Sequence, residues 1–226
     1  SGLDVALPQG ADRAHAIRGL DLELSANEIL CVVGESGSGK SMTASALMRL
    51  LPTGVKIVAG GIEFDGRDLL ALSEAQMREV RGRQIAMVFQ EPARYLNPSF
   101  RVGSQITEML GLHLGMNRRE AEDRAAELAG LVGLGGARRA LRAYPHELSG
   151  GMKQRAMIAM AISCNPRMLI ADEPTTALDV TLQLQILSLI VRLRETFRMG
   201  ILFISHDLRL VRTVAGDHRD RRPRPQ

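Results

Sequence analysis

GESGSGKS, residues Gly34 to Ser41, joins an apolar run (Ile29 to Val33) to a helix-like run (Met42 to Leu51). The spacing Gly-x4-Gly-Lys-Ser is a phosphate-binding loop pattern. Small residues let backbone N–H groups surround phosphate oxygens, which a Cβ atom would obstruct. A glycine-rich turn that matches by accident is the alternative. The order of strand, loop and helix favours phosphate binding.

Each part of this loop has an expected role toward a nucleotide. Lys40 can reach the β- and γ-phosphates, and the Ser41 hydroxyl can ligate Mg²⁺. The positive end of the following helix adds to the attraction for anions. A loop of this kind identifies a nucleotide but not a function, because several classes of ATPase and GTPase carry it. The residues expected to contact the nucleotide are Gly34, Glu35, Ser36, Gly37, Ser38, Gly39, Lys40, Ser41 and Met42.

The composition fits one large domain and lacks the strong positive charge typical of nucleic-acid-binding proteins. Hydrophobic residues make up 45% of the 226 positions, and the formal net charge is +4, half of it in residues 217–226. Aromatic residues are 3% with no Trp, so platforms for base stacking are not expected. Cys31 and Cys164 lie in apolar runs and predict reduced thiols in a cytosolic protein. No apolar run approaches the roughly 20 residues of a membrane helix.

Strand and helix patterns predict an α/β core that a helical insertion interrupts. Alternation predicts strands at 20–24 and 61–64, and strand signals then vanish from about 102 to 134. They return in two short apolar runs, which are typical of strands buried on both faces of a parallel sheet. Those runs are Met168 to Ala171 and Ile201 to Ile204. We expect a core of residues 1–90 and 166–215, a helical subdomain of residues 91–165 and an irregular basic tail of residues 216–226.

Two carboxylates follow the first of these buried strands, at Asp172 and Glu173. Ligands of open α/β sheets bind beyond the carboxyl ends of the strands, so both side chains should face the glycine-rich loop. Asp172 could then hold Mg²⁺, and Glu173 could orient and polarise an attacking water. An exposed acidic turn before Pro174 is the alternative, and the phosphate-binding loop makes it the weaker one.

LSGGMKQR, residues Leu148 to Arg155, predicts a second anion site. Ser149 is a good helix N-cap, and Gly150 and Gly151 leave backbone N–H groups accessible at the start of the next helix. An ordinary capped turn is the alternative. One chain rarely needs two cradles for a γ-phosphate, unless the second serves a nucleotide on another subunit.

In this order, the motifs resemble those of ABC transporter ATPases. The resemblance adds Gln90 after a strand, the stretch Thr176 to Asp179 and His206 after a strand, and it covers about residues 20–214. MVFQEPARYLNP and YPHELSGGMKQRAMIAMAISCNPRMLIADEPTTALDVT resemble the D-type ATPase subunit of oligopeptide and dipeptide importers, a group that includes nickel importers. The resemblance to ABC transporter ATPases implies a P-loop NTPase core of the ABC type, with a mostly parallel sheet, an antiparallel β subdomain and an all-helical insertion.

The resemblance also implies an activity and partners. It implies an ATP hydrolase, using ATP and Mg²⁺, that powers uptake of di- and oligopeptides from the cytoplasmic face of the inner (plasma) membrane. Partners would be a second ATPase subunit in a homo- or heterodimer, two membrane permease subunits and, indirectly, a solute-binding protein; no nucleic acid is expected. The transported solute stays open.

The resemblance assigns roles to individual residues. Glu173, His206 and Gln90 would be catalytic, and Ser41, Gln90 and Asp172 would hold the metal. Ser149, Gly150, Gly151 and Asp179 would serve the nucleotide of a partner subunit that closes head to tail. By itself, Gln90 could be a polar strand end, His206 a helix-start residue and Asp179 a helix cap.

Two stretches depart from the family pattern. Many ABC ATPases stack adenine on an aromatic residue about two dozen residues before the loop, and Gly10 to His15 contains none. Adenine contacts could come from His15, Arg13 or apolar side chains. The stretch from Gly216 to Gln226 cannot form the buried strand pair of the family. A solvated tail and a lipid-contacting tail are alternatives, and we favour a truncated or frameshifted ending.

Two further functions compete with the importer ATPase. One is a soluble ABC ATPase that acts on DNA or ribosomes, although the long coiled-coil or zinc-bearing insertions of such proteins are not visible. The other is an inactive, truncated product that retains the motifs.

Overall fold

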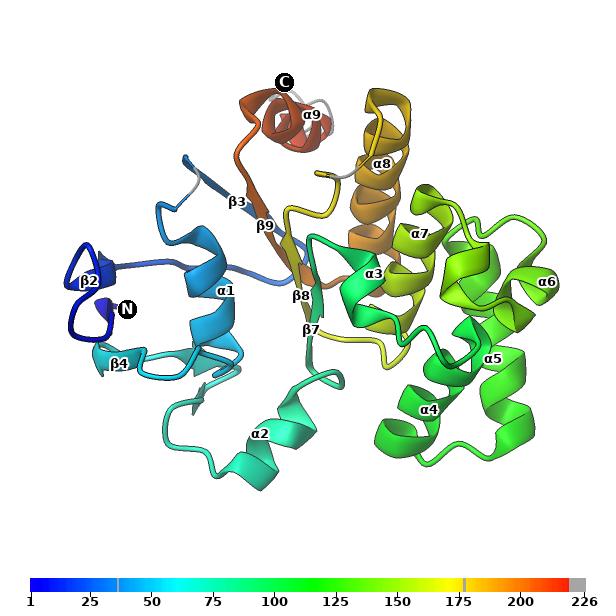
Figure 1. Cartoon of the computed structure of the whole chain (residues 1–226), viewed down its shortest axis with the longest axis horizontal. Helices are drawn as coiled ribbons and strands as arrows, with labels where there is room; N and C mark the ends of the chain where they lie inside the picture. The colour runs from blue at the N-terminus through cyan, green and yellow to red at the C-terminus, as the bar shows by residue number, and fades with distance from the viewer. Residues whose placement is uncertain (36, 177, 220–226) are drawn as a thin grey trace, which may run out of the picture.

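The computed structural model describes residues 1–35, 37–176 and 178–219 (Figure 1). Its strands are β1 Leu3–Ala6, β2 His15–Leu20, β3 Ile29–Val33, β4 Lys56–Ala59, β5 Glu63–Phe64, β6 Arg67–Asp68, β7 Ile85–Val88, β8 Met168–Asp172 and β9 Gly200–Ser205. Its helices are α1 Lys40–Leu47, α2 Glu74–Val80, α3 Pro92–Tyr95, α4 Val102–Leu114, α5 Arg118–Leu131, α6 Ala137–Arg142, α7 Gly150–Ala161, α8 Val180–Phe197 and α9 Leu208–Arg219, with a 3₁₀ turn at Pro145–Glu147.

A four-stranded parallel sheet in the order β3-β9-β8-β7 forms the centre of the molecule. Successive side chains of a strand point to opposite faces. Leu169 and Phe203 therefore enter the hydrophobic cluster on the helical side, whereas Ile170 and Leu202 enter the cluster on the other side. Both strands predicted from short apolar runs are confirmed, and burial on both faces explains why those runs show no alternation.

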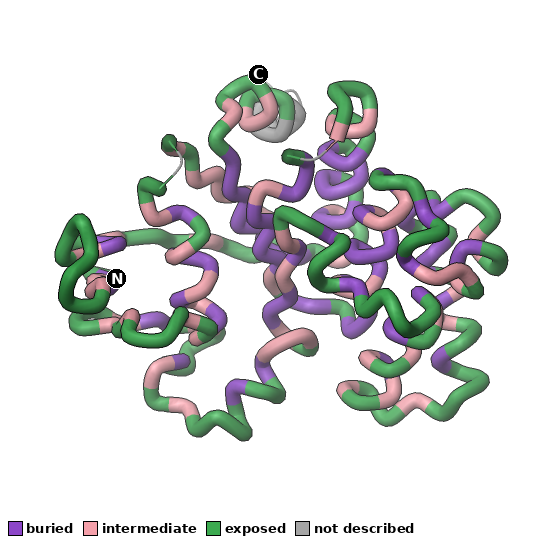
Figure 2. Tube along the Cα trace, viewed as in Figure 1, coloured by how far each residue is buried: buried purple, intermediate pink, exposed green. Residues whose placement is uncertain are grey.

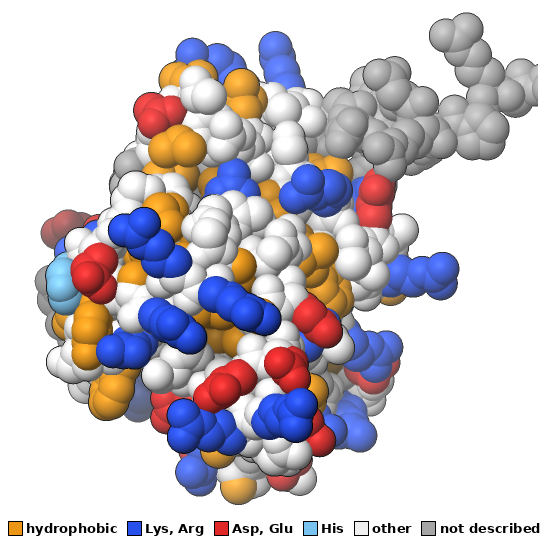
Figure 3. Space-filling model, turned by 90° about the vertical axis from the view of Figure 1, so that its right-hand side faces the viewer, with side chains coloured by type: hydrophobic (Ala, Val, Ile, Leu, Met, Phe, Trp, Pro, Cys, Tyr) orange, Lys and Arg blue, Asp and Glu red, His pale blue; other side chains and the backbone are white. Residues whose placement is uncertain are grey.

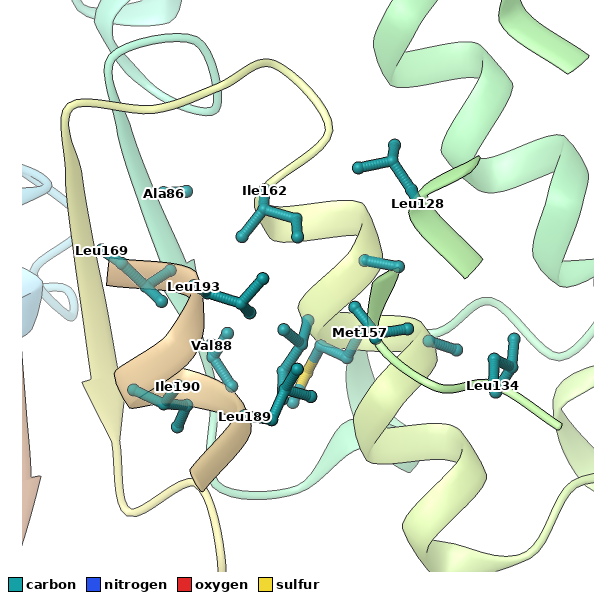
Figure 4. Close-up of a cluster of buried hydrophobic side chains, with 14 of the residues drawn as sticks. Ala86, Val88, Leu128, Leu134, Met157, Ile162, Leu169, Leu189, Ile190 and Leu193 are labelled. Atoms are coloured by element: carbon teal, nitrogen blue, oxygen red, sulfur yellow. The ribbon is translucent and has the colours of Figure 1, made fainter. Parts of the chain in front are cut away.

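The helical side of the sheet is continuous with the lobe formed by α4, α5 and α6. Figure 4 shows Leu169 of the sheet next to Ile190 and Leu193 of α8, with Met157 of α7 and Leu128 of α5 farther along the same cluster. All five side chains are at most 1% exposed. Because packed interiors transmit displacements, this core couples the position of the helical lobe to the sheet.

The other side of the sheet is covered by α1 and by the antiparallel sheet β2-β1-β4 (Figures 1 and 2). Val5 of β1 and Ala44 of α1 are fully buried there. α1 ends at Leu47, four residues before the expected end of the helix-like run, and Arg49 then takes a left-handed conformation (φ 51°). The antiparallel part of the predicted fold is therefore present.

The strand predicted at 20–24 is wrong in its position. The strand is β2, which pairs with β1 in an antiparallel register that ends at the pair Leu3 and Leu20. β1 begins at Leu3, so residues 21–24 have no partner strand in this sheet. Their alternating leucines lie outside any strand.

The C-terminal region also differs from the expected irregular tail. α9 continues to Arg219, so residues 216–219 are helical. Within residues 216–226 the first proline is Pro223, so no residue of 216–222 lacks the backbone N–H that a helix needs. The rest of the predicted tail, residues 220–226, lies outside the described residues.

Between β7 and β8 the elements that the structure describes are all helical. The domain boundaries given above remain predictions. No helix in the described part of the chain is long and apolar enough to cross a membrane. Cys31 and Cys164 are free thiols, and burial raises the pKa of both.

Candidate active site

A cavity of about 660 Å³ lies where the parallel strands end and α1 begins. It contains the phosphate-binding loop together with side chains that follow three other strands. Its lining residues are Leu7, Arg13, Ala16, Glu35, Gly37, Gly39, Lys40, Ser41, Met42, Gln90, Glu173, Thr176 and His206. The topology therefore brings residues from across the chain to one edge of the sheet, as the carboxyl ends of parallel strands do.

Lys40, the first residue of α1, is fixed inside the loop. Its Nζ donates to the carbonyl oxygens of Gly34 and Glu35, both at 2.6 Å, and lies 3.4 Å from Ser38 Oγ. The residue is only 7% exposed, yet it lines the cavity. Lys40 is thus held by its own loop with its side chain at the cavity wall.

Two glycines give the loop its shape. Gly39 has φ 98°, and a Cβ atom there would lie 2.4 Å from the carbonyl oxygen of Ala16. Gly37 has φ 80° with open space around it. Gly39 is also the N-cap of α1 and provides no capping side chain, so the first N–H groups of the helix remain available to an anion. Ser36 lies outside the described residues.

Asp172 and Ser41, two of the three residues predicted to hold the metal, are hydrogen-bonded to each other. Ser41 Oγ donates to Asp172 Oδ1 at 3.1 Å across 131 residues of sequence. Burial, the largest effect, raises the pKa of Asp172, and the Glu173 carboxylate adds to it, although the Ser41 hydrogen bond and Lys40 lower it. A hydroxyl and a carboxylate are the oxygen ligands that Mg²⁺ prefers.

No group of three or more His, Cys, Asp or Glu side chains among the described residues could hold a metal ion. Mg²⁺ is commonly bound by one or two protein ligands together with substrate phosphates and water. The donors present at Ser41 and Asp172 fit that mode.

The Glu173 carboxylate is the meeting point of three other side chains. Its Oε2 lies 2.9 Å from Thr176 Oγ1, 3.1 Å from His206 Nδ1 and 3.3 Å from Gln90 Nε2. Glu173 has φ 46°, which is uncommon for a residue with a side chain, and its N–H donates to the carbonyl oxygen of Ile204. The left-handed backbone is held by the neighbouring strand β9, and it directs the carboxylate into the cavity.

The β1–β2 turn and the start of β2 supply further residues of the cavity. Leu7 N donates to the carbonyl oxygen of Ala14 and thereby closes the turn between β1 and β2, and Arg13 lies within that turn. Arg13 Nη2 donates to Gly37 O at 2.5 Å. Leu7, Arg13 and Ala16 line the cavity, and His15 is not among its lining residues. No aromatic side chain except His206 lines it among the described residues.

The predicted second anion site lies elsewhere. Ser149 caps α7 by accepting a hydrogen bond from Met152 N, and it and Gly150 are exposed. Gly151 is buried, and a Cβ atom there would lie 3.2 Å from the Leu182 side chain. None of Ser149, Gly150 and Gly151 is among the residues that line the cavity with Lys40 and Glu173.

Asp179 lies next to that second site and not in the cavity. Its carboxylate accepts a hydrogen bond from Leu182 N at 2.9 Å and so caps α8. Leu182 also faces Gly151, and Leu178 approaches Gly150. The helix-cap interpretation of Asp179 therefore holds in this structure, and its place at a subunit interface remains a prediction.

Three cavity residues were not predicted by the sequence patterns. Thr176 could have been predicted, because it lies three residues after Glu173 and a hydroxyl at that spacing can donate a hydrogen bond to the carboxylate. Leu7 and Ala16 could not have been predicted from a local pattern, because only the fold of the β1–β2 turn brings them to the loop.

Comparison with known proteins identifies the family of this chain. The ABC transporter family model matches residues 17–176. The chain is 53% identical over 198 residues to a probable peptide ABC transporter ATP-binding protein of Sinorhizobium fredii, covering 87% of this chain and 59% of that protein. It is 50% identical over 202 residues to the oligopeptide transport ATP-binding protein OppD of Bacillus subtilis, covering 89% and 56%.

A third relative is the glutathione import ATP-binding protein GsiA of Salmonella typhimurium, 49% identical over 221 residues, covering 95% of this chain and 36% of that protein. The chain thus spans between about a third and three fifths of the length of these relatives.

Solved structures share the fold. A dimeric structure of MJ0796, described as a bacterial ABC transporter cassette, has a TM-score of 0.79 and 26% identity and covers 93% of this chain and 90% of that chain. A second structure of MJ0796, in a post-hydrolysis state bound to ADP and Pi, has the same values. The predicted ABC-type fold is confirmed, and the chain belongs to the ABC transporter family.

Proposed function

We propose that this chain binds ATP with Mg²⁺ and hydrolyses it. The observation that carries the proposal is the single cavity in which Lys40 of the loop and the Glu173 carboxylate, with its three partners, are exposed to the same space. A phosphate cradle alone would support binding only. A carboxylate aimed into the same space supports hydrolysis.

Binding would involve two sets of cavity residues, those of the loop and those of the β1–β2 turn and the start of β2. Lys40, the loop N–H groups and the start of α1 would contact the triphosphate. Ser41 and Asp172 would hold Mg²⁺, which when bound neutralises charge on the phosphate oxygens. Leu7, Arg13 and Ala16 would contact the base, because they line the cavity from the β1–β2 turn and the start of β2 and can cover a base without an aromatic platform. A guanidinium plane and two apolar side chains can cover a purine face.

Hydrolysis would depend on Glu173 and its partners. The carboxylate would orient a water molecule and accept its proton. His206, 3.1 Å away at Nδ1, would fix the carboxylate and face the terminal phosphate. Gln90 and Thr176 would limit the carboxylate to one orientation, and Gln90 would also be able to reach the metal.

A second subunit would complete the site. Ser149, Gly150 and Asp179 are exposed and lie outside the cavity of their own chain. Donors that face outward at the start of α7 fit a γ-phosphate bound by another subunit. We therefore propose a head-to-tail dimer of two such chains or of this chain and a related one.

Peptide import is the process that the relatives support. Two of those reported above are named for peptide or oligopeptide transport, and the third for glutathione, itself a small peptide. The chain would then act from the cytoplasmic face of the membrane with two permease subunits and a solute-binding protein.

ATP binding and phosphate release by the purified chain test the proposal. Lys40→Ala should weaken ATP binding about tenfold to a hundredfold, because a hydrogen bond to a charged group contributes about 1.5–3 kcal/mol. Lys56→Ala removes an exposed lysine of β4 and is the matched control. Equal ATP affinity in the Lys40 and Lys56 variants would contradict the nucleotide site.

Peptide import needs its own test. The chain would be reconstituted with the permease and solute-binding proteins encoded beside its gene. Peptide-loaded binding protein should stimulate phosphate release in that complex, and stimulation by a non-peptide solute alone would contradict peptide import.

A further inference from the structure

A second hollow, of about 500 Å³, lies on the helical lobe between α4, α5 and α6. It has no lining residue in common with the nucleotide cavity. The residues from α4 and its N-cap are Arg101, Gly103, Ser104 and Thr107. Those from α5 and α6 are Arg118, Glu122, Asp123, Ala125, Ala126, Arg138, Leu141 and Arg142.

The hollow has an excess of positive charge. Four arginines line it against two carboxylates, and one of those, Glu122, pairs with Arg118 at 2.8 Å. Within the described part of the chain, no carboxylate forms an ion pair with Arg138 or Arg142. Figure 3 shows this side of the molecule, where Lys and Arg side chains gather over the helical lobe. Arg101 lies over the Tyr144 ring, 5.8 Å from its centroid, so the guanidinium groups of Arg138 and Arg142 are the ones most open to an anion.

Backbone and hydroxyl donors add to these charges. The N-cap of α4 is Arg101, which provides no capping hydrogen bond to this 13-residue helix. Val102 N donates to Ala143 O, whereas the N–H groups of Gly103 and Ser104, in the first turn, have no side-chain cap. Gly103 and Ser104 of that turn line the hollow. A Cβ atom at Gly103 would lie 2.8 Å from Leu141 O, so close packing of α4 on α6 forms this wall. Helix N-termini favour anions.

We propose that this hollow is a phosphate-binding site that is separate from the nucleotide cavity. Guanidinium groups bind phosphate oxygens through two parallel hydrogen bonds, and several arginines around one concave space suit a compact multivalent anion better than an extended acidic chain. The same chemistry is offered by the headgroup of an anionic phospholipid and by a soluble phosphate compound. The Ser104 hydroxyl and the first turn of α4 would contact the oxygens that the arginines leave free.

Binding can be measured while the nucleotide cavity is filled. The full chain, saturated with ADP and Mg²⁺, would be titrated with inorganic pyrophosphate, and in a second arm mixed with phosphatidylcholine vesicles with or without phosphatidylglycerol. The test variant is Arg138→Ala with Arg142→Ala. The control is Arg119→Ala with Arg139→Ala, which removes the same charge from α5 and α6 at positions that do not line the hollow.

We expect the test variant to lose about tenfold or more in affinity, the loss of roughly one charged hydrogen bond, and the control to lose little. Loss in the pyrophosphate arm identifies a soluble phosphate as ligand, and loss only in the vesicle arm identifies a headgroup. Equal loss in both variants means general electrostatic attraction and overturns the site. Absence of binding in both arms also overturns it, as does binding of a polyglutamate peptide without binding of either phosphate probe.

Discussion

The candidate nucleotide site has a core part, around Lys40 and Glu173, and a helical part, around Ser149. A single chain assembles the first but not the second. The core part is closed within the chain: Lys40 donates to its own loop, Ser41 reaches Asp172, and Glu173 is surrounded by three side chains. The helical part is displayed outward, since Ser149 and Gly150 are exposed and line no part of that cavity. We infer that nucleotide binding belongs to one chain and hydrolysis to two.

Glu173→Gln should have the largest effect, and only on the core part. The amide cannot accept a proton from water, so hydrolysis should fall by about 10²- to 10⁴-fold while ATP binding is retained. Phosphate release in single turnovers, with ATP affinity measured in parallel, checks this. Thr176→Val removes one hydrogen bond to the same carboxylate and should cost far less. Wild-type turnover in the Glu173 variant would remove that residue from catalysis.

Arg13→Ala tests which residues of the core part contact the base and which contact the phosphates. If Arg13 covers the base, ATP affinity should fall about tenfold, as expected when a cation–π or stacking contact of about 1–2 kcal/mol is lost. Inorganic tripolyphosphate, which has no base, should bind unchanged. Arg18→Ala removes an exposed arginine of β2 that does not line the cavity and is the matched control. A parallel loss of tripolyphosphate binding would mean that Arg13 acts on the phosphates through its hydrogen bond to Gly37.

Asp179→Ala should have the smallest effect. It tests the N-cap of α8, which lies beside the exposed start of α7. Loss of the cap on α8 should lower the free energy of unfolding by about 1 kcal/mol. Asp179→Asn keeps a good cap and should restore that stability, which denaturant unfolding would measure. If the Asn variant is stable but hydrolyses ATP slowly, the carboxylate has a role beyond capping. If both variants unfold like wild type, the cap contributes nothing.

The sequence predicted those parts of the site that short-range pattern determines. A glycine-rich loop after a strand, and two carboxylates after another, are local signals, and parallel strands bring their ends together. The β1–β2 turn was not predicted to reach the loop, because Leu7 and Ala16 meet the cavity only through tertiary packing. The position of β2 was also missed, since the leucine alternation at 20–24 is stronger than that of His15–Leu20 and only the pairing with β1 decides between them.

Ser149→Arg tests the central claim most directly. A bulky cation at the start of α7 should leave the affinity of the isolated chain for ATP unchanged, because Ser149 does not line its own cavity. Hydrolysis should fall by about 10²-fold or more, because donors to the phosphate no longer arrive from the second subunit. If the dimer is made of two such chains, activity should partly return in a mixture with the Lys40→Ala chain, since one composite site then combines an intact Lys40 with an intact Ser149; with a related partner chain, the Lys40→Ala change is made in that partner. If ATP affinity falls as far in the Ser149 variant as in the Lys40 variant, the helical part acts within its own chain and the division between the two parts is wrong.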